Sequence, residues 1–143
     1  MKINVFFCDD IRKEEDGRRT YVGVFNNKFK LREEKELLPR FFAMCELILE
    51  VNEAIPSPSP LFIIKKGDNI IGEFEVIQQD INDINVARGS THKIEVEITP
   101  LIVSYGEIVY GLLKRDDEII QVKKLEFIKD EPKKIKRSKK SEK

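Results

Sequence analysis

Residue types that carry metal or covalent chemistry are scarce in this chain of 143 residues. There is no tryptophan, one histidine, His92, and two cysteines, Cys8 and Cys45. Tetrahedral zinc sites and disulfide frameworks need more cysteine and histidine than this, so the composition argues against both. Isolated cysteines without close spacing predict a reducing, cytoplasmic setting.

Long apolar runs are also missing. The longest run is no more than about five residues, whereas a membrane-spanning helix needs roughly 18 or more. The sequence therefore predicts no membrane anchor, and its charged beginning predicts no signal peptide. The seven glycines never form a phosphate-binding motif, so we expect no nucleotide or other cofactor.

Charge is distributed unevenly along the chain, although the formal net charge is zero. Residues 129–143 hold eight basic and three acidic residues, which leaves 18 basic and 23 acidic residues in 1–128. The tail is too poor in apolar residues to offset its ordering entropy, so we predict a domain over 1–128 and a disordered tail over 129–143. Its candidate nucleic-acid contacts are Lys133, Lys134, Lys136, Arg137, Lys139 and Lys140.

Short segments that alternate apolar and polar residues recur from the first residues to about residue 128. This pattern, without any strand–helix alternation, is typical of an all-β fold. We predict an antiparallel β-sandwich of about seven or eight strands with immunoglobulin-like topology, and a closed barrel is the alternative. The clearest segments are 2–8, 20–25, 61–66, 70–77, 93–98, 107–114 and 118–128.

Residues 41–51 fit two templates. Their apolar residues fall on odd positions, as in a strand with one buried face. The spacing of Glu46, Glu50 and Glu53, together with Pro39, also fits an amphipathic helix over 39–53, which would make the fold α+β. We favour the strand, because the segments after it are strand-like and need partners.

Two hairpins and a bulge complete the predicted architecture. Gly67-Asp68-Asn69 and Arg115-Asp116-Asp117 are turns between strand segments. In the last strand the apolar residues change from even positions, Ile120 and Val122, to odd positions, Leu125 and Phe127. We predict a β-bulge at Lys123-Lys124, which would let both pairs face the core. Residues 79–92 are polar and predict a loop, with a short helical turn near 81–84.

Both ends of the sequence resemble a known family. The first motif is Phe6-Phe7-Cys8-Asp9-Asp10-Ile11-Arg12-x-Glu14, and the second is Gly17-x-x-Thr20-Tyr21-Val22-Gly23-Val24-Phe25. They are similar to the start of a family of small bacterial proteins without assigned activity, whose closing hairpin resembles residues 106–127. The resemblance implies a β-rich fold and a bacterial or phage origin, and it implies no activity.

The first acidic cluster is the strongest candidate for a cation site. Asp9, Asp10 and residues 14–16 supply carboxylates, but basic residues lie among them and the spacing does not match an EF-hand loop. Local ion pairing explains the cluster better, so we expect no metal. Asp10 and Arg12, two residues apart, form a candidate structural ion pair that fixes the first hairpin.

No catalytic constellation is recognisable. His92 follows a polar segment, and no nucleophile or second carboxylate is placed beside it by the sequence, so the expected state is an exposed loop histidine. Cys8 and Cys45 fit buried apolar cysteines better than nucleophiles. We therefore expect a protein that is not an enzyme and has no catalytic residues.

The sequence favours a small binding or accessory module that engages a protein partner, or a second copy of itself, through loops or a sheet edge. A phage or bacterial defence setting fits the family resemblance. One alternative is a nucleic-acid-associated protein that uses the basic tail. Another is a metal-dependent binder or hydrolase.

Overall fold

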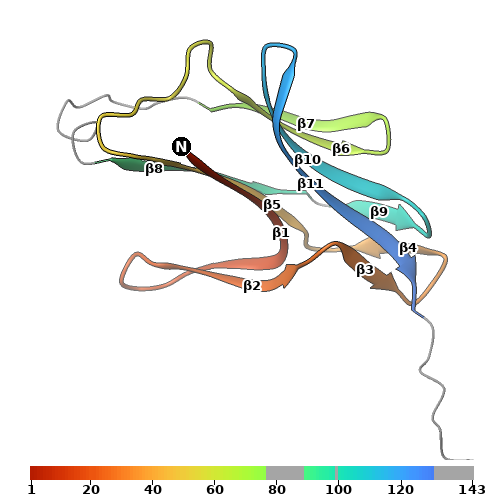
Figure 1. The fold of residues 1–143 in the computed structure, drawn as a ribbon. Coiled ribbons are helices and arrows are strands. Elements are labelled where there is room, and N and C mark those ends of the chain that lie inside the picture. Colours follow the sequence, from red (N-terminus) through yellow and green to blue (C-terminus); the bar gives the residue numbers. More distant parts are fainter. Residues whose placement is uncertain (77–88, 99, 131–143) are drawn as a thin grey trace, which may run out of the picture.

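A computed structural model describes residues 1–76, 89–98 and 100–130, and these residues form eleven β-strands and no helix (Figure 1). The predicted all-β class is confirmed. Among the described residues there is accordingly no helix able to cross a membrane. The strands are β1 (Lys2–Lys13), β2 (Arg19–Phe25), β3 (Lys28–Leu31), β4 (Lys35–Leu38), β5 (Phe42–Leu49), β6 (Leu61–Lys66), β7 (Asn69–Glu75), β8 (Ser90–Glu97), β9 (Leu101–Ser104), β10 (Ile108–Arg115) and β11 (Glu118–Lys129).

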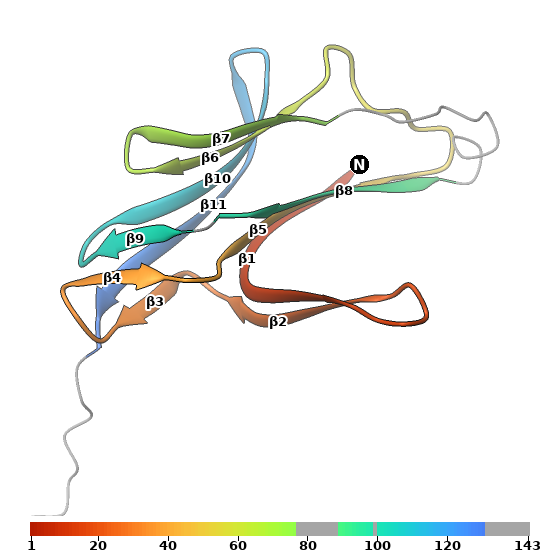
Figure 2. The ribbon, with the colours of Figure 1, turned by 180° about the vertical axis from the view of Figure 1, so that it is seen from behind.

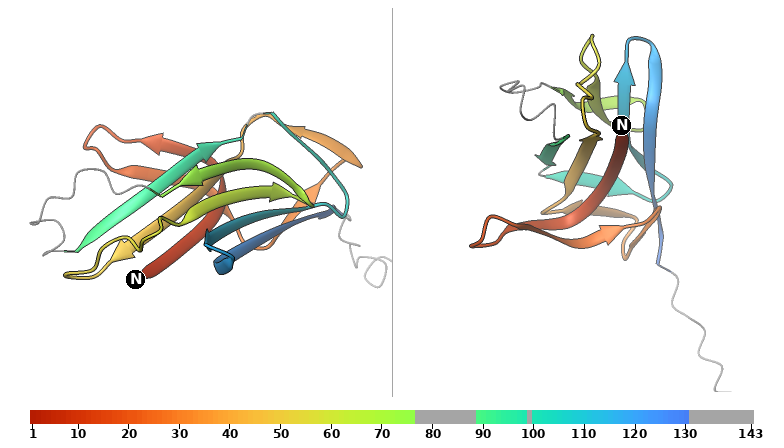
Figure 3. Two further views of the ribbon diagram at one scale, coloured as in Figure 1. Left: turned by 90° about the horizontal axis from the view of Figure 1, so that it is seen from above. Right: turned by 60° about the vertical axis from the view of Figure 1, so that its left-hand side comes forward.

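Two main sheets face each other across the core (Figures 2 and 3). The four-stranded sheet has the order β2-β1-β5-β8, the five-stranded sheet has the order β3-β11-β10-β6-β7, and β4 pairs with β9 separately. Each main sheet keeps two edges within the described residues, which is the arrangement of a sandwich and not of a closed barrel. The immunoglobulin-like connectivity stays a prediction.

Within segment 41–51, residues Phe42–Leu49 form the strand β5, as we favoured, and the chain turns at Val51. In β5 the side chains of Ala43, Cys45 and Leu47 are fully buried and face the other sheet. On the opposite face Met44 is buried too, and Glu46 and Ile48 are half-buried. A strand that is covered on both faces explains why its sequence is apolar enough to fit a helix as well.

Aromatic rings connect the two sheets at one end of the core. Phe41 stacks on Phe7 and Phe25 of the four-stranded sheet, with ring centroids 5.4 and 5.9 Å apart. It also lies 6.4 Å from Phe127 of the five-stranded sheet, and Phe29 bridges Phe25 and Phe127. Five phenylalanines thus form a continuous contact from one layer to the other.

The structure contains more strands than predicted. The short strands β4 and β9 lie in segments without a clear alternation, and they are stabilised by pairing with each other. β3 pairs parallel to β11, so the sandwich is not purely antiparallel. β8 begins at Ser90, which makes the loop prediction wrong for residues 90–92. The remainder of that loop, residues 79–88, lies outside the described residues, as does the helical turn.

The bulge predicted at Lys123-Lys124 is wrong. The register shifts nearer the turn, where Leu113 pairs with Gln121 but Lys114 pairs with Ile119. Val122 therefore points away from the core and is 43% exposed. β11 continues past Ile128 to Lys129, and the Asp130 amide donates a hydrogen bond to Leu31 at 2.9 Å.

Candidate functional site

The predicted ion pair between Asp10 and Arg12 is present in the structure, but it is not the closest contact of that carboxylate. Arg12 Nε lies 3.5 Å from Asp10 Oδ2, and the Arg12 side chain is 65% exposed. Arg40, just before β5, places Nη2 2.9 Å from Asp10 Oδ1, and the Ile11 amide donates to the same oxygen. The sequence did not indicate Arg40, because only the fold brings it beside Asp10.

The remaining acids of the first cluster are engaged locally in the turn between β1 and β2. Glu14 accepts a hydrogen bond from Thr20 Oγ1 at 2.7 Å, and Asp16 pairs with Arg18. Within the described residues, no group of three or more histidine, cysteine, aspartate or glutamate side chains is arranged to hold a metal ion.

Neither cysteine has the environment of a nucleophile. Both side chains are fully buried. Burial raises the pKa of the Cys8 thiol to about 11, with further contributions from nearby acids including Asp10. Burial raises the pKa of Cys45 to about 12, and the Glu46 carboxylate adds to the shift. Nucleophilic thiols require the opposite, a depressed pKa, so both are protonated near neutral pH.

His92 lies in β8, not in a loop, and it is half-buried. It pairs with Leu47, whose side chain points into the core. Its Nε2 lies 2.9 Å from Ser90 Oγ, and burial lowers the pKa of the imidazole. A serine beside a histidine is two parts of a hydrolytic triad. In the part of the chain that the structure describes, no carboxylate lies against the ring, so the third member of such a triad is not present there.

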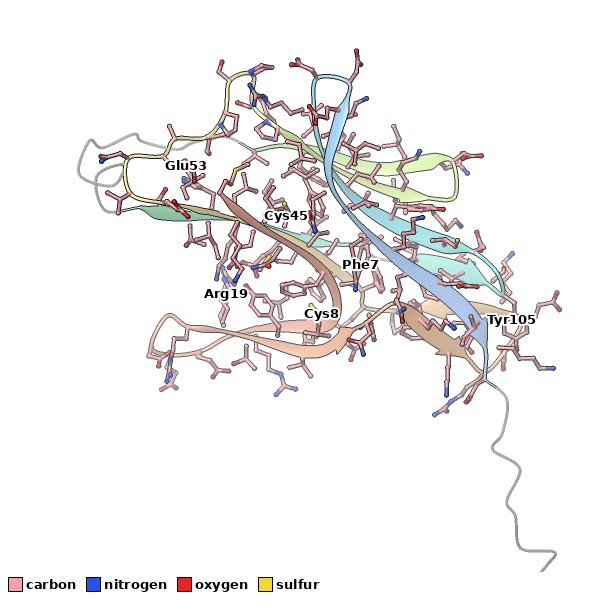
Figure 4. All side chains as sticks on the ribbon, in the orientation of Figure 1. Phe7, Cys8, Arg19, Cys45, Glu53 and Tyr105 are labelled. Carbon is pink, nitrogen blue, oxygen red and sulfur yellow. The ribbon has the colours of Figure 1, made fainter. Side chains whose placement is uncertain are left out.

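A polar cluster lies where the β1–β2 hairpin crosses the outward face of the four-stranded sheet. Arg19 on β2 reaches toward β8 (Figure 4), and its Nε lies 2.9 Å from Glu95 Oε1. On the same face Lys93 pairs with Glu46 at 3.6 Å, and its ammonium lies 5.8 Å from the Tyr21 ring centroid. These five residues are called the hairpin cluster below.

Two atoms of the hairpin cluster are buried without a hydrogen-bond partner, namely Tyr21 Oη and Glu95 Oε2. Burial raises the pKa of Tyr21, and the Glu95 carboxylate raises it further. The charged groups of this cluster are paired with one another, and Phe6 packs edge-on against Tyr21 at 5.1 Å. The cluster therefore holds the hairpin against the sheet instead of leaving an accessible site.

An apolar groove lies between the edges of the two main sheets. β7 is an edge of the five-stranded sheet, and β8 is an edge of the four-stranded sheet. The groove has a volume of about 260 Å³, several times the roughly 30 Å³ share of one water molecule. Its lining is Ile64, Ile71, Gly72 and Phe74 on one side and Val96, Glu97, Ile98 and Pro100 on the other.

The floor of this groove reaches the core, because Ile64 is fully buried. Gly72 lies under the Phe74 ring, and a Cβ at this position would come within 2.8 Å of Phe74 Cε2. The ring thus covers the glycine and forms part of the wall. Ile71, at a shift in the β6–β7 register, is 41% exposed at the rim. The available sequence signal for this site was Gly72, because a glycine two residues before an aromatic residue in a strand leaves room for the ring to lie over the backbone.

No family model matches this chain. No curated protein matches it either. The resemblance to a bacterial family therefore stays a prediction. The six candidate nucleic-acid residues of the tail, 133–140, lie outside the described residues, so their role stays a prediction as well.

Proposed function

We propose that this chain is a small binding module that captures an extended segment of another protein along β7. The observation that carries the proposal is the apolar groove beside β7, an edge strand that pairs only with β6 among the residues that the structure describes. The bacterial or phage setting inside a cell, suggested by the sequence, stays part of this proposal.

The backbone of β7 supplies the first part of the recognition. In the described residues β7 pairs with β6 alone, so the other side of the strand presents a row of backbone N–H and C=O groups. An added strand satisfies these groups through main-chain hydrogen bonds, which give affinity without sequence preference. Natural proteins commonly protect such edges, and one that stays open is suited to pairing.

The groove supplies the second part. Side chains of an added strand alternate between the two faces, so every second residue points toward the core side. One such side chain can enter the groove between Phe74 and Ile98. Because the groove is lined mainly by aliphatic and aromatic groups, we propose an aliphatic residue there. Full burial of one such residue contributes about 1.5–3 kcal/mol.

Selection from a displayed library of random linear peptides, followed by fluorescence anisotropy with the selected peptides, tests the proposal. The informative variant is Ile71→Lys, which places a charge at the rim of the groove. We expect binding to weaken at least about tenfold, as the loss of one buried aliphatic contact implies. Amide hydrogen exchange should show protection along β7 when a peptide is bound.

Ile119→Lys is the matched control, because Ile119 is also an exposed isoleucine, at 55%, and lies on β11 away from the groove. It should bind the selected peptides like the wild type. Equal weakening by both variants, or protection that excludes β7, would contradict strand capture.

A further inference from the structure

The outward side of the β7 edge carries two acidic side chains. Phe74 faces the core side and lines the groove, so its neighbours Glu73 and Glu75 point outward. Both glutamates are exposed, and their cross-strand partners on β6 are the apolar residues Ile63 and Leu61. A strand added along β7 would therefore meet one negative charge on each side of the position opposite Phe74.

The other charges of this sheet face lie farther from an added strand. Lys65 is on β6, Lys114 is on β10, and Lys124 and Glu126 are on β11, with the lysines of β3 beyond them. These strands lie about 10, 14, 19 and 24 Å from an added strand, whereas β7 lies about 5 Å from it. Inside the groove the charged lining residue is also an acid, Glu97. The charges nearest to an added strand are thus acidic.

The tail of the chain contains a segment with the complementary pattern. Residues 131–143 contain one aliphatic side chain besides proline, that of Ile135, and it lies between Lys134 and Lys136. In an extended strand, residues two apart point to the same face, so both lysines point outward when Ile135 points to the core side. The two lysines are then about 7 Å apart, which is the spacing of Glu73 and Glu75.

One register satisfies both patterns. With Ile135 opposite Phe74, the isoleucine enters the groove, and each flanking lysine lies opposite one glutamate. Aromatic–aliphatic and opposite-charge pairs across strands both stabilise a sheet. A shift by one residue would turn the lysines toward the groove and the isoleucine outward, so the register is specified.

The tail is too short to reach the groove of its own chain. Through β6 and β10, Phe74 lies in the same cross-strand row as Gln121 of β11. Gln121 and Asp130 are nine positions apart, and four strand spacings separate β11 from a strand added to β7, so the direct distance is about 35 Å. The five residues from Asp130 to Ile135 span at most about 18 Å. Figure 1 shows the end of β11 far from β7.

We infer that β7 of one copy of this chain captures residues 133–137 of a second copy. The inference rests on the proposed strand capture and names the captured segment. The overall charges favour the contact, because residues 129–143 hold eight basic and three acidic residues and residues 1–128 hold 18 basic and 23 acidic residues. Copies then associate through their tails, and a tail competes with any other segment for β7.

Charge exchange in the full chain tests the register. Glu73→Lys with Glu75→Lys, and separately Lys134→Glu with Lys136→Glu, place like charges opposite each other at two positions. Each double variant should self-associate at least about tenfold more weakly than the wild type in sedimentation equilibrium. The fourfold variant should regain the wild-type association, and a mixture of the two double variants should associate.

Lys139→Glu with Lys140→Glu is the matched control, because it makes the same change of charge outside the captured segment. It should self-associate like the wild type. Ile135→Asp should weaken self-association at least about tenfold, and Ile135→Val should preserve it. A monomeric wild-type protein overturns the inference. Equal weakening by the two tail charge variants overturns it as well.

A labelled peptide with the sequence of residues 131–143 separates this inference from the proposed function. The peptide should bind the wild type and displace the peptides selected from the library. If selected peptides bind along β7 and the tail peptide does not displace them, the inference fails and strand capture stands. Self-association that follows the charge exchanges, without any selected library peptide, supports the inference and limits capture to the tail.

Discussion

At the scale of single residues, Gly111 shows how tightly the two sheets pack. A Cβ added at this position would lie 2.8 Å from Val5 Cγ1 and 3.3 Å from Phe7 Cζ. Both neighbours belong to β1 in the opposite sheet, and Phe7 is fully buried. Only glycine allows β10 to pass this close to β1 without moving core side chains.

Gly111→Ala should lower the free energy of unfolding by about 1–3 kcal/mol, the usual cost of overpacking a core. Chemical denaturation measures the change. The control is a double-mutant cycle with Val5→Ala, which removes the methyl group that the new Cβ would meet. The cost of Gly111→Ala should be smaller in that background. An equal cost in both backgrounds would show that the Val5 contact is not the cause.

The two thiols determine part of the response to alkaline pH. The pKa values of Cys8 and Cys45 are raised in the folded protein to about 11 and about 12, from an ordinary value of 9.0. Above pH 9 the unfolded chain releases these protons while the folded chain retains them, so stability falls as pH rises. Each thiol contributes a slope of up to about 1.4 kcal/mol per pH unit until the pH approaches its folded pKa.

Denaturation curves of the wild type and of a Cys8→Ala, Cys45→Ala variant, recorded between pH 8 and pH 11, measure this contribution. The variant removes only the two thiols. It keeps the tyrosines and lysines, which also titrate at alkaline pH and therefore contribute equally to both curves. Its stability should therefore decline less steeply than that of the wild type. Parallel declines would show that the thiols ionise equally well in both states.

At the scale of secondary structure elements, the hairpin formed by β1 and β2 acts as a cover. Cys8 lies on the outward face of the four-stranded sheet, with Phe6, and is nevertheless fully buried. The hairpin cluster fastens this cover through the Arg19–Glu95 pair. Partly buried pairs of this kind stabilise by only about 1 kcal/mol or less, so the cover opens more readily than the core.

Arg19→Ala should increase the rate at which a thiol reagent modifies Cys8 by about two- to fivefold, in line with the loss of one such pair. Modification of Cys45, which lies inside the sandwich, should not change. Mass spectrometry of the labelled peptides separates the two sites. Arg18→Ala is the control, because Arg18 is 84% exposed and pairs only within the turn. An equal acceleration at both cysteines would mean global and not local opening.

The elements that the sequence predicted well are those whose own residues determine them. The strand 93–98 alternates charged and aliphatic residues, and the hairpins 61–77 and 107–128 have turn residues between two apolar segments. β4 and β9 were missed because their stability comes from pairing with each other across more than 60 positions of sequence. The bulge was misplaced for a related reason. We placed it on the assumption that every apolar residue of the last strand faces the core, whereas Val122 faces outward.

At the scale of the whole molecule, the groove depends on both main sheets. Residues of β6 and β7 in the five-stranded sheet line one side, and residues of β8 in the four-stranded sheet, with Ile98 and Pro100 after it, line the other. Neither sheet forms the groove alone, so its shape depends on how the two sheets pack.

The amino-acid sequence by itself determined the all-β class, the main strands and the uneven charge, because alternation, turn residues and composition are local properties. It also disfavoured zinc and disulfide chemistry, because two widely spaced cysteines and one histidine are too few. Only the tertiary structure decided that Ile71 borders a groove, that Val122 and Ile63 point away from the core, and that Arg40 contacts Asp10. Those facts depend on strand order and register, which arise from contacts between residues far apart in the chain.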